Sequence, residues 1–141
     1  IGIDISPKAI KIALENSKRM KLCNRVNFRV LEIDKIYGNK FDLVVSNPPY
    51  IPLKDIKNLS KDVKNYEPII ALNGGVDGLD LIKKVIYKST RALRKSGLLA
   101  IEIGNGQYKK VSNILRQNGF REYSKECDYK DNVRCIISTK L

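Results

Sequence analysis

Residues 41–50 read Phe-Asp-Leu-Val-Val-Ser-Asn-Pro-Pro-Tyr. The segment 41–45 is short, apolar and rich in β-branched residues, which is typical of a buried strand. The two consecutive prolines that follow lack backbone donors and fix φ, so the chain has to leave the sheet in a rigid turn. This turn holds the Asn47 amide and the Tyr50 ring in set positions at the strand end. A bare Pro-Pro pair is also common in ordinary turns, so the flanking residues have to decide its meaning.

Strand and helix patterns alternate on both sides of this stretch. The predicted elements are strands at 1–5, 26–34, 41–46, 98–103, 120–127 and 133–139, and helices at 7–20, 79–96 and 111–118. Residues 50–76 contain prolines and a Gly-Gly pair, and we expect a long polar loop of the kind that is usually functional or mobile. Strands separated by helices predict an α/β sheet with right-handed crossovers, and the last two strands predict an antiparallel pair.

The composition fits one globular domain in the cytoplasm. A chain of 141 residues is long enough for one real core, so residues 1–141 are expected to be one domain. No apolar stretch approaches membrane-spanning length and no signal peptide is recognisable, so we expect no membrane partner. Three cysteines without a CxxC pattern, and the absence of histidine, argue against a disulfide framework, a metal site and Cys-His or Ser-His catalysis.

The charge is strongly basic. Lysine and arginine number 27 against 15 acidic residues, a net charge of +12, which favours a polyanionic partner such as nucleic acid or a ribosome. The lysines are spread along the whole chain, however, and Lys, Asn and Ile are abundant together. Background composition therefore explains the charge as well as a partner does.

Polar side chains stand at the predicted strand ends, where open α/β sheets bind ligands. They are Asp4, Asp34, the segment 47–50 and the segment 102–105. Two carboxylates and an amide at such ends suit a nucleoside, because one acid can accept from ribose hydroxyls and another from the amine of adenine. Each aspartate alone is equally explained as a helix cap or turn residue.

At this point the chain resembles a known family. The Asn-Pro-Pro-Tyr stretch after an apolar strand is similar to the catalytic motif of class I S-adenosylmethionine-dependent methyltransferases acting on planar nitrogens. Further motifs resemble the HemK/PrmC family, which methylates the glutamine of the Gly-Gly-Gln tripeptide in peptide-chain release factors. These motifs are Tyr66-Glu67-Pro68, Ala71-Leu72, Gly74-Gly75-x-Asp77-Gly78-Leu79, Glu102-x-Gly104-x-x-Gln107 and Asp128-Tyr129-x-Asp131-Asn132-x-Arg134. The resemblance spans essentially the whole chain and implies a Rossmann-like sheet.

The resemblance also implies roles for individual residues. The Asn47 side-chain oxygen and the Pro48 carbonyl would accept both N–H bonds of the substrate amide, and Tyr50 would pack on the amide plane. These three form the expected catalytic set, with Pro49 beside them in the substrate site. For the cofactor S-adenosylmethionine, Asp4 would hold the ribose hydroxyls and Asn47 would border the site. Asp34 and Lys35 would border the adenine. Glu102 is either part of the site or a satisfied carboxylate that braces its loop.

The chain also departs from the family pattern. It begins with Ile1 inside a strand, and we expect it to have been cut from something longer. The family's glycine-rich first motif and its helical N-terminal domain are absent, so residues 1–141 are expected to be a partial catalytic domain, truncated at its N-terminus. The absent strand would lie between those carrying Asp4 and Asn47. We therefore expect rearranged strands, a strand exchanged between copies, or exposed edges that pair into oligomers. Weak cofactor binding and no activity are expected of this length alone.

Two rival functions follow from the same residues. DNA adenine-N6 or rRNA guanine-N2 methylation is favoured by the tetrapeptide and the charge, but no target-recognition domain or aromatic basic strip accompanies them. A non-catalytic module that binds ribosomes or RNA through its lysines is the other rival, although it gives no reason for an intact Asn-Pro-Pro-Tyr.

Overall fold

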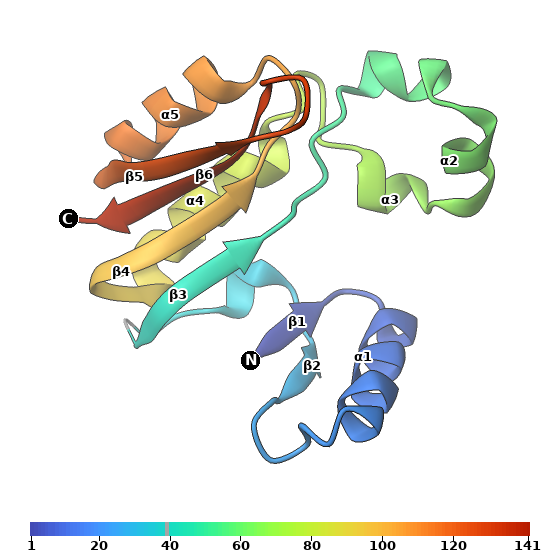
Figure 1. Cartoon of the computed structure of the whole chain (residues 1–141), viewed down its shortest axis with the longest axis vertical. Helices are drawn as coiled ribbons and strands as arrows, with labels where there is room; N and C mark the ends of the chain where they lie inside the picture. Colours follow the sequence, from blue (N-terminus) through green and yellow to red (C-terminus); the bar gives the residue numbers. More distant parts are fainter. Residues whose placement is uncertain (39) are drawn as a thin grey trace. The chain divides into compact units, whose positions relative to one another are not determined.

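The structure is a computed structural model that describes residues 1–38 and 40–141, with the backbone alone at residue 64. The chain divides into two compact units, Ile1–Ile36 and Tyr37–Leu141, and each is described by itself. Strands and helices alternate along both (Figure 1). The predicted α/β character is therefore confirmed.

The first unit is a strand–helix–strand unit followed by one short turn of helix. It contains β1 (Gly2–Asp4), α1 (Pro7–Arg19), β2 (Phe28–Val30) and the 3₁₀ helix η1 (Ile33–Lys35). β1 and β2 pair in parallel, and α1 connects them. The Ser6 hydroxyl accepts from the Ala9 N–H at 3.3 Å, which caps the helix as its Ser-Pro start predicts. The second strand is shorter than predicted, because its last residues turn into η1.

The second unit is built on a four-stranded sheet. Its strands are β3 (Phe41–Ser46), β4 (Leu93–Glu102), β5 (Phe120–Cys127) and β6 (Val133–Lys140), in the spatial order β3-β4-β6-β5. β3 and β4 are parallel, whereas β6 is antiparallel to both β4 and β5, so the predicted antiparallel pair is confirmed. The helices α4 (Asp80–Ala92) and α5 (Tyr108–Gln117) cover one face of this sheet (Figure 1).

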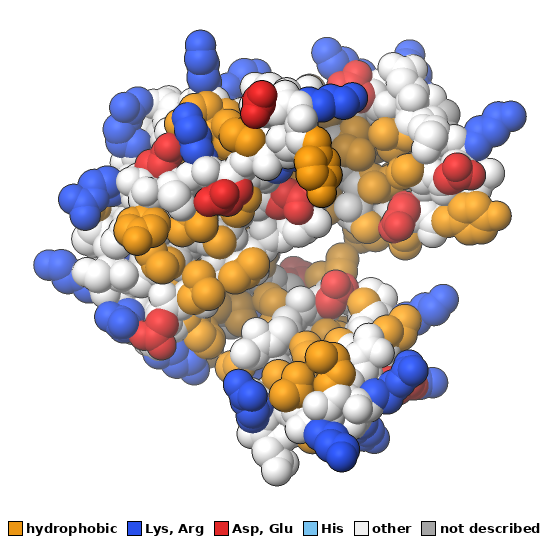
Figure 2. Space-filling model, in the orientation of Figure 1, with side chains coloured by type: hydrophobic (Ala, Val, Ile, Leu, Met, Phe, Trp, Pro, Cys, Tyr) orange, Lys and Arg blue, Asp and Glu red, His pale blue; other side chains and the backbone are white. Residues whose placement is uncertain are grey.

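The core lies between that sheet face and the two helices. Alternate residues of β4 are fully buried there, as a half-covered strand requires. The fully buried hydrophobic side chains of the sheet and of the segment after β4 are Leu93, Leu99, Ile101, Ile103 and Ile136, and those of the helices include Ile82, Ile86, Val111 and Leu115. The other sheet face is partly open, and hydrophobic side chains are visible over it in Figure 2.

β3 is an edge strand of its sheet, and the prediction that it is buried was wrong. Leu43 is 52% exposed and Val45 is 72% exposed. Within the described residues β3 pairs only with β4, and β1 belongs to a separate two-stranded sheet. An apolar, β-branched run predicts a strand correctly, but it does not reveal what covers each face.

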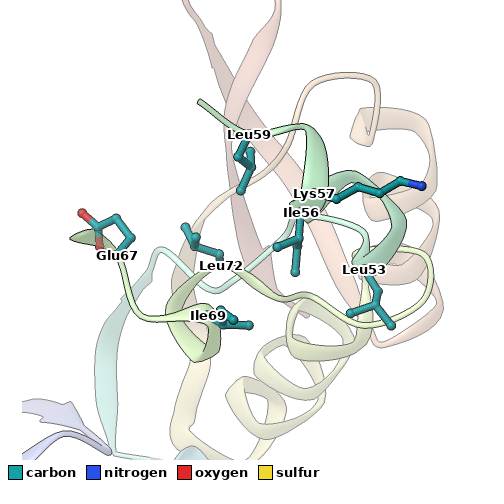
Figure 3. A pocket seen from close by; sticks show the side chains of 7 residues that line it. All are labelled: Leu53, Ile56, Lys57, Leu59, Glu67, Ile69 and Leu72. Carbon is teal, nitrogen blue, oxygen red and sulfur yellow. The ribbon is translucent and has the colours of Figure 1, made fainter. Parts of the chain in front are cut away.

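The segment expected to be a long polar loop contains three short helical pieces. They are η2 (Leu53–Asn58), α2 (Lys61–Tyr66) and α3 (Ile69–Leu72). Apolar side chains from η2 and α3 converge on a cavity of about 450 Å³ (Figure 3). The residues that line this cavity are Leu53, Ile56, Lys57, Leu59, Glu67, Ile69 and Leu72. Each helix is only four to six residues long, too short to show helical periodicity in the sequence.

Helix α4 ends at Ala92, four residues earlier than its predicted end at the Ser96-Gly97 pair. Leu93 is fully buried and pairs with Phe41, so tertiary packing draws the chain into β4 before the glycine. The Lys140 ammonium donates to the carbonyls of Thr90 (2.6 Å) and Leu93 (2.8 Å) at this helix end. A cation therefore satisfies the helix end in place of a glycine cap.

Candidate active site

The Asn-Pro-Pro-Tyr stretch leaves the carboxyl end of β3 in the second unit. Asn47 is exposed, Pro48 is buried, and Pro49 and Tyr50 are half-buried. Among the described residues the Asn47 side chain has no hydrogen-bond partner, so its amide is available to a ligand. The buried Pro48 anchors the turn. Asn47 and Tyr50, which flank the proline pair, differ in their surroundings. The asparagine is free while the tyrosine is held.

Two charged side chains hold the Tyr50 phenol. Its Oη donates to Glu102 Oε1 at 3.0 Å and accepts from Arg134 Nη2 at 2.9 Å. Arg134 Nη2 also lies 3.6 Å from Glu102 Oε1, and its guanidinium carbon is 5.5 Å from the centre of the tyrosine ring. Glu102 ends β4 and pairs in register with Cys135 of β6, next to Arg134. The strand order β3-β4-β6 thus brings the three side chains together.

This environment keeps the Tyr50 phenol protonated. Burial raises its pKa above the ordinary value of 10.0, the Glu102 carboxylate raises it further, and Arg134 partly offsets the rise. Since the phenol already donates to a carboxylate, it is poorly placed to take a proton from a substrate. Its contribution at the site is therefore the position of its ring.

The backbone of Tyr50 is held by one buried glutamine. Gln107 Nε2 donates to the carbonyl of Tyr50 at 3.0 Å and to the carbonyl of Gly78 at 3.2 Å. Its Oε1 accepts from the Gly104 N–H at 2.8 Å, so all three contacts run through a side chain that is only 8% exposed. A buried polar group of this kind ties three chain segments together, because each would otherwise lose its partner.

The loop after α3 clamps the segment that follows Tyr50. Three backbone hydrogen bonds join the two: Ile51 N to Leu72 O (3.0 Å), Gly74 N to Ile51 O (2.9 Å) and Leu53 N to Gly75 O (2.9 Å). The contact is too close for side chains. A Cβ on Gly74 would lie 2.8 Å from the Cα of Tyr50, and one on Gly78 would lie 2.4 Å from its carbonyl oxygen. The glycines of this loop are therefore part of the support of the site.

Three of the four expected cofactor residues, Asp4, Asp34 and Lys35, lie in the first unit, and the fourth, Asn47, lies in the second. Asp4 is exposed at the carboxyl end of β1, and its Oδ1 accepts from the Ser6 N–H at 2.7 Å. Asp34 and Lys35 are exposed in η1, which follows the parallel neighbour β2. Carboxylate oxygens at the ends of two adjacent parallel strands are suitable acceptors for the hydroxyls and amine of a nucleoside. These acceptor groups therefore fit a nucleoside cofactor.

Metal ligands and thiols are the remaining candidate reactive groups in the part of the chain that the structure describes. No group of three or more His, Cys, Asp or Glu side chains there could hold a metal ion. The cysteines are free thiols, with Cys23 and Cys127 exposed and Cys135 half-buried. No helix among residues 1–38 and 40–141 has the length and apolarity needed to cross a membrane.

The fold and the site define a class of protein. Residues 1–140 match the model of the methyltransferase domain family, and the chain belongs to that family. Among solved structures it is similar to the ribosomal protein L11 methylase of Lactobacillus delbrueckii subsp. bulgaricus. That likeness has a TM-score of 0.66 and 18% identity, over 99% of this chain and 57% of the other. The expected class I methyltransferase fold is confirmed.

Two curated relatives refine this class. The chain is 43% identical to the release factor glutamine methyltransferase of Clostridium acetobutylicum over 97% of its length and 49% of the relative. It is 40% identical to the ribosomal protein uL3 glutamine methyltransferase of Francisella tularensis over 75% of its length and 34% of the relative. The resemblance to release factor glutamine methyltransferases is thus confirmed. The chain spans about half the length of the curated relatives it matches.

The structure adds three residues that sequence reasoning had not placed at the site. Gln107 and Arg134 were recognised only as members of motifs, and Glu102 was left between a site role and a bracing role; the structure shows that each contacts Tyr50. The contacts of Glu102 match its interpretation as a satisfied carboxylate. Its position at a strand end was a usable signal, whereas the register that brings Arg134 beside it depends on the antiparallel return of β6.

Proposed function

We propose that this chain carries the acceptor half of a methyltransferase site. The enzyme would transfer a methyl group from S-adenosylmethionine to the side-chain amide nitrogen of the Gly-Gly-Gln glutamine in peptide-chain release factors. The observation that carries the proposal is the free, exposed Asn47 amide beside a Tyr50 ring held by Glu102 and Arg134. The names of the curated relatives support the choice of a glutamine nitrogen.

The chemistry of the acceptor explains why an asparagine is needed. The lone pair of an amide nitrogen is delocalised into its carbonyl, so the nitrogen is a poor nucleophile. Asn47 Oδ1 and the Pro48 carbonyl would accept its two N–H bonds and aim the nitrogen at the methyl group. Tyr50 would pack against the amide plane with Pro49 beside it. Positioning of this kind lowers a barrier without prior removal of a proton. One N–H proton would be lost to solvent after the methyl group has been transferred, and the demethylated cofactor would leave.

Cofactor binding would fall to the residues of the first unit, which we propose is part of the same catalytic domain. Asp4 would accept from the ribose hydroxyls, while Asp34 and Lys35 would border the adenine. When bound, S-adenosylmethionine supplies a methyl group already activated by a positively charged sulfur. The chain's own residues then have to hold the acceptor nitrogen in line with the methyl group and exclude unreactive orientations of the amide.

An experiment with purified acceptors tests this proposal. The full-length protein is incubated with S-adenosylmethionine and a peptide-chain release factor. Methylation of the Gly-Gly-Gln peptide is then measured by mass spectrometry. We expect methylation by the natural sequence and by the control Asn58→Ala, which changes an exposed asparagine of the same unit. Asn47→Ala should abolish it while the thermal unfolding midpoint stays unchanged. Retained methyl transfer by Asn47→Ala would refute the role given to the tetrapeptide.

A second acceptor has specific support. The relative named for ribosomal protein uL3 makes a ribosomal protein glutamine the next candidate, with the same reacting group. The assay therefore offers uL3, DNA and rRNA beside the release factor. If uL3 is methylated in preference to the release factor, uL3 replaces the release factor as the proposed substrate. Methylation of DNA or rRNA alone would contradict it, as would salt-dependent RNA binding without any methyl transfer.

A further inference from the structure

We propose that Glu102 and Arg134 are positioning residues that fix the Tyr50 ring for the acceptor amide and act on methyl transfer only through the tyrosine hydroxyl. This inference rests on the proposed function. It assigns to two residues outside the Asn-Pro-Pro-Tyr stretch the task of orienting a residue inside it. Neither of them is needed as a group that touches the substrate.

The contacts leave the tyrosine hydroxyl fully engaged. Oη donates once, to Glu102 at 3.0 Å, and accepts once, from Arg134 at 2.9 Å. Hydrogen bonds to charged groups are stronger than those between neutral groups, so the ring end is held from two sides. Glu102 and Arg134 come from neighbouring strands of one sheet and not from a mobile loop. The hydroxyl is therefore attached to the hydrogen-bonded sheet of the second unit.

The remaining parts of Tyr50 are fixed from other directions. Gln107 holds its carbonyl, and the ring edge packs against Gly104, where an added Cβ would lie 3.1 Å from Cδ2 of the tyrosine. Release of the hydroxyl would leave the backbone in place but let the ring turn about its side-chain bonds. A ring that turns lowers the fraction of bound acceptor in the reactive geometry, which affects kcat more than binding of the cofactor.

A double-mutant cycle tests whether the two residues act through the hydroxyl. Glu102→Gln and Arg134→Met are made in the natural sequence and in Tyr50→Phe, which keeps the ring and removes only Oη. Each single change should lower kcat about 10- to 100-fold, the range of a charged hydrogen bond, with KM for S-adenosylmethionine unchanged. In the Tyr50→Phe background neither should lower kcat further. Equal losses in both backgrounds would overturn the proposal.

Conservative and control variants separate positioning from folding. Arg134→Lys keeps the charge and one donor, and should retain more kcat than Arg134→Met. Glu126→Gln and Arg121→Met change exposed residues of β5 and should leave kcat unchanged. An Arg134→Lys variant that is folded but no better than Arg134→Met would contradict the proposal, because charge and donor would then be irrelevant.

A spectroscopic measurement keeps this inference distinct from the proposed function. The Tyr50 phenol is titrated by ultraviolet absorbance as the difference between each protein and its Tyr50→Phe counterpart. Glu102→Gln should lower the phenol pKa and Arg134→Met should raise it, since the carboxylate raises and the guanidinium lowers it in the natural sequence. If no acceptor is methylated but both shifts appear, the proposed function fails and the contacts stand. If neither variant moves the titration, the positioning role fails regardless of activity.

Discussion

Replacement of Gln107 by leucine should destabilise the second unit by about 3 kcal/mol. The change removes hydrogen bonds of 2.8, 3.0 and 3.2 Å, all made by a side chain that is 8% exposed. The carbonyls of Tyr50 and Gly78 and the N–H of Gly104 would lose their partner. An unsatisfied buried group costs about 1–3 kcal/mol, and part of that is recovered because leucine fills the space with apolar atoms.

Urea unfolding followed by tyrosine fluorescence measures this loss. All seven tyrosines lie between Tyr37 and Tyr129, so the signal reports on the second unit alone, and the chain has no tryptophan. With an m-value of about 2 kcal/mol/M, a loss of about 3 kcal/mol lowers the midpoint by roughly 1.5 M. Gln117→Leu, which changes an exposed glutamine at the end of the helix that Gln107 precedes, is the matched control. A midpoint for Gln107→Leu equal to that of the control would refute the reasoning.

Two further predictions concern the same support of Tyr50. Gly78→Ala should lower the urea midpoint more than Gly106→Ala does. Both glycines have φ near +77°, but only at position 78 would the added Cβ meet the Tyr50 carbonyl, whereas nothing lies within 4 Å at position 106. Equal midpoints would show that the close approach has no cost. The raised pKa of Tyr50 predicts a dependence on pH. Its contribution to stability is complete below the ordinary phenol pKa of about 10 and is lost as the pH rises through the folded value. The natural sequence should therefore lose stability relative to Tyr50→Phe in alkaline urea titrations, and a constant difference would contradict the contacts described for the phenol.

Local sequence patterns predicted most elements because those elements carry their own signals. The Ser-Pro start of α1, the glycine after α5 and the apolar run of β3 each act over a few residues. The helical pieces between residues 53 and 72 are too short to show helical periodicity, although Ser60 caps the start of α2. The early end of α4 was missed because the burial of Leu93 in the sheet outweighs the local Ser-Gly stop.

The site was only partly predictable for a related reason. Asn47 and Tyr50 stand in one tetrapeptide, so the pattern contains them together. The residues that hold Tyr50 come from later strands and turns, and their approach depends on the order β3-β4-β6. Sequence spacing does not encode that order directly. The exposure of Val45 was missed for a similar reason, since the type of a residue does not show what packs against it.

The sequence separations around Tyr50 have a consequence during synthesis. Its partners lie 52 residues (Glu102), 57 residues (Gln107) and 84 residues (Arg134) further along the chain. At a translation rate of about 5–20 residues per second, Arg134 is added roughly 4–17 s after Tyr50. Contacts between such distant residues are also slow to form. A nascent chain would therefore carry an intact Asn-Pro-Pro-Tyr for several seconds before it can hold the tyrosine, and methyl-transfer competence would arise only after β6 has emerged.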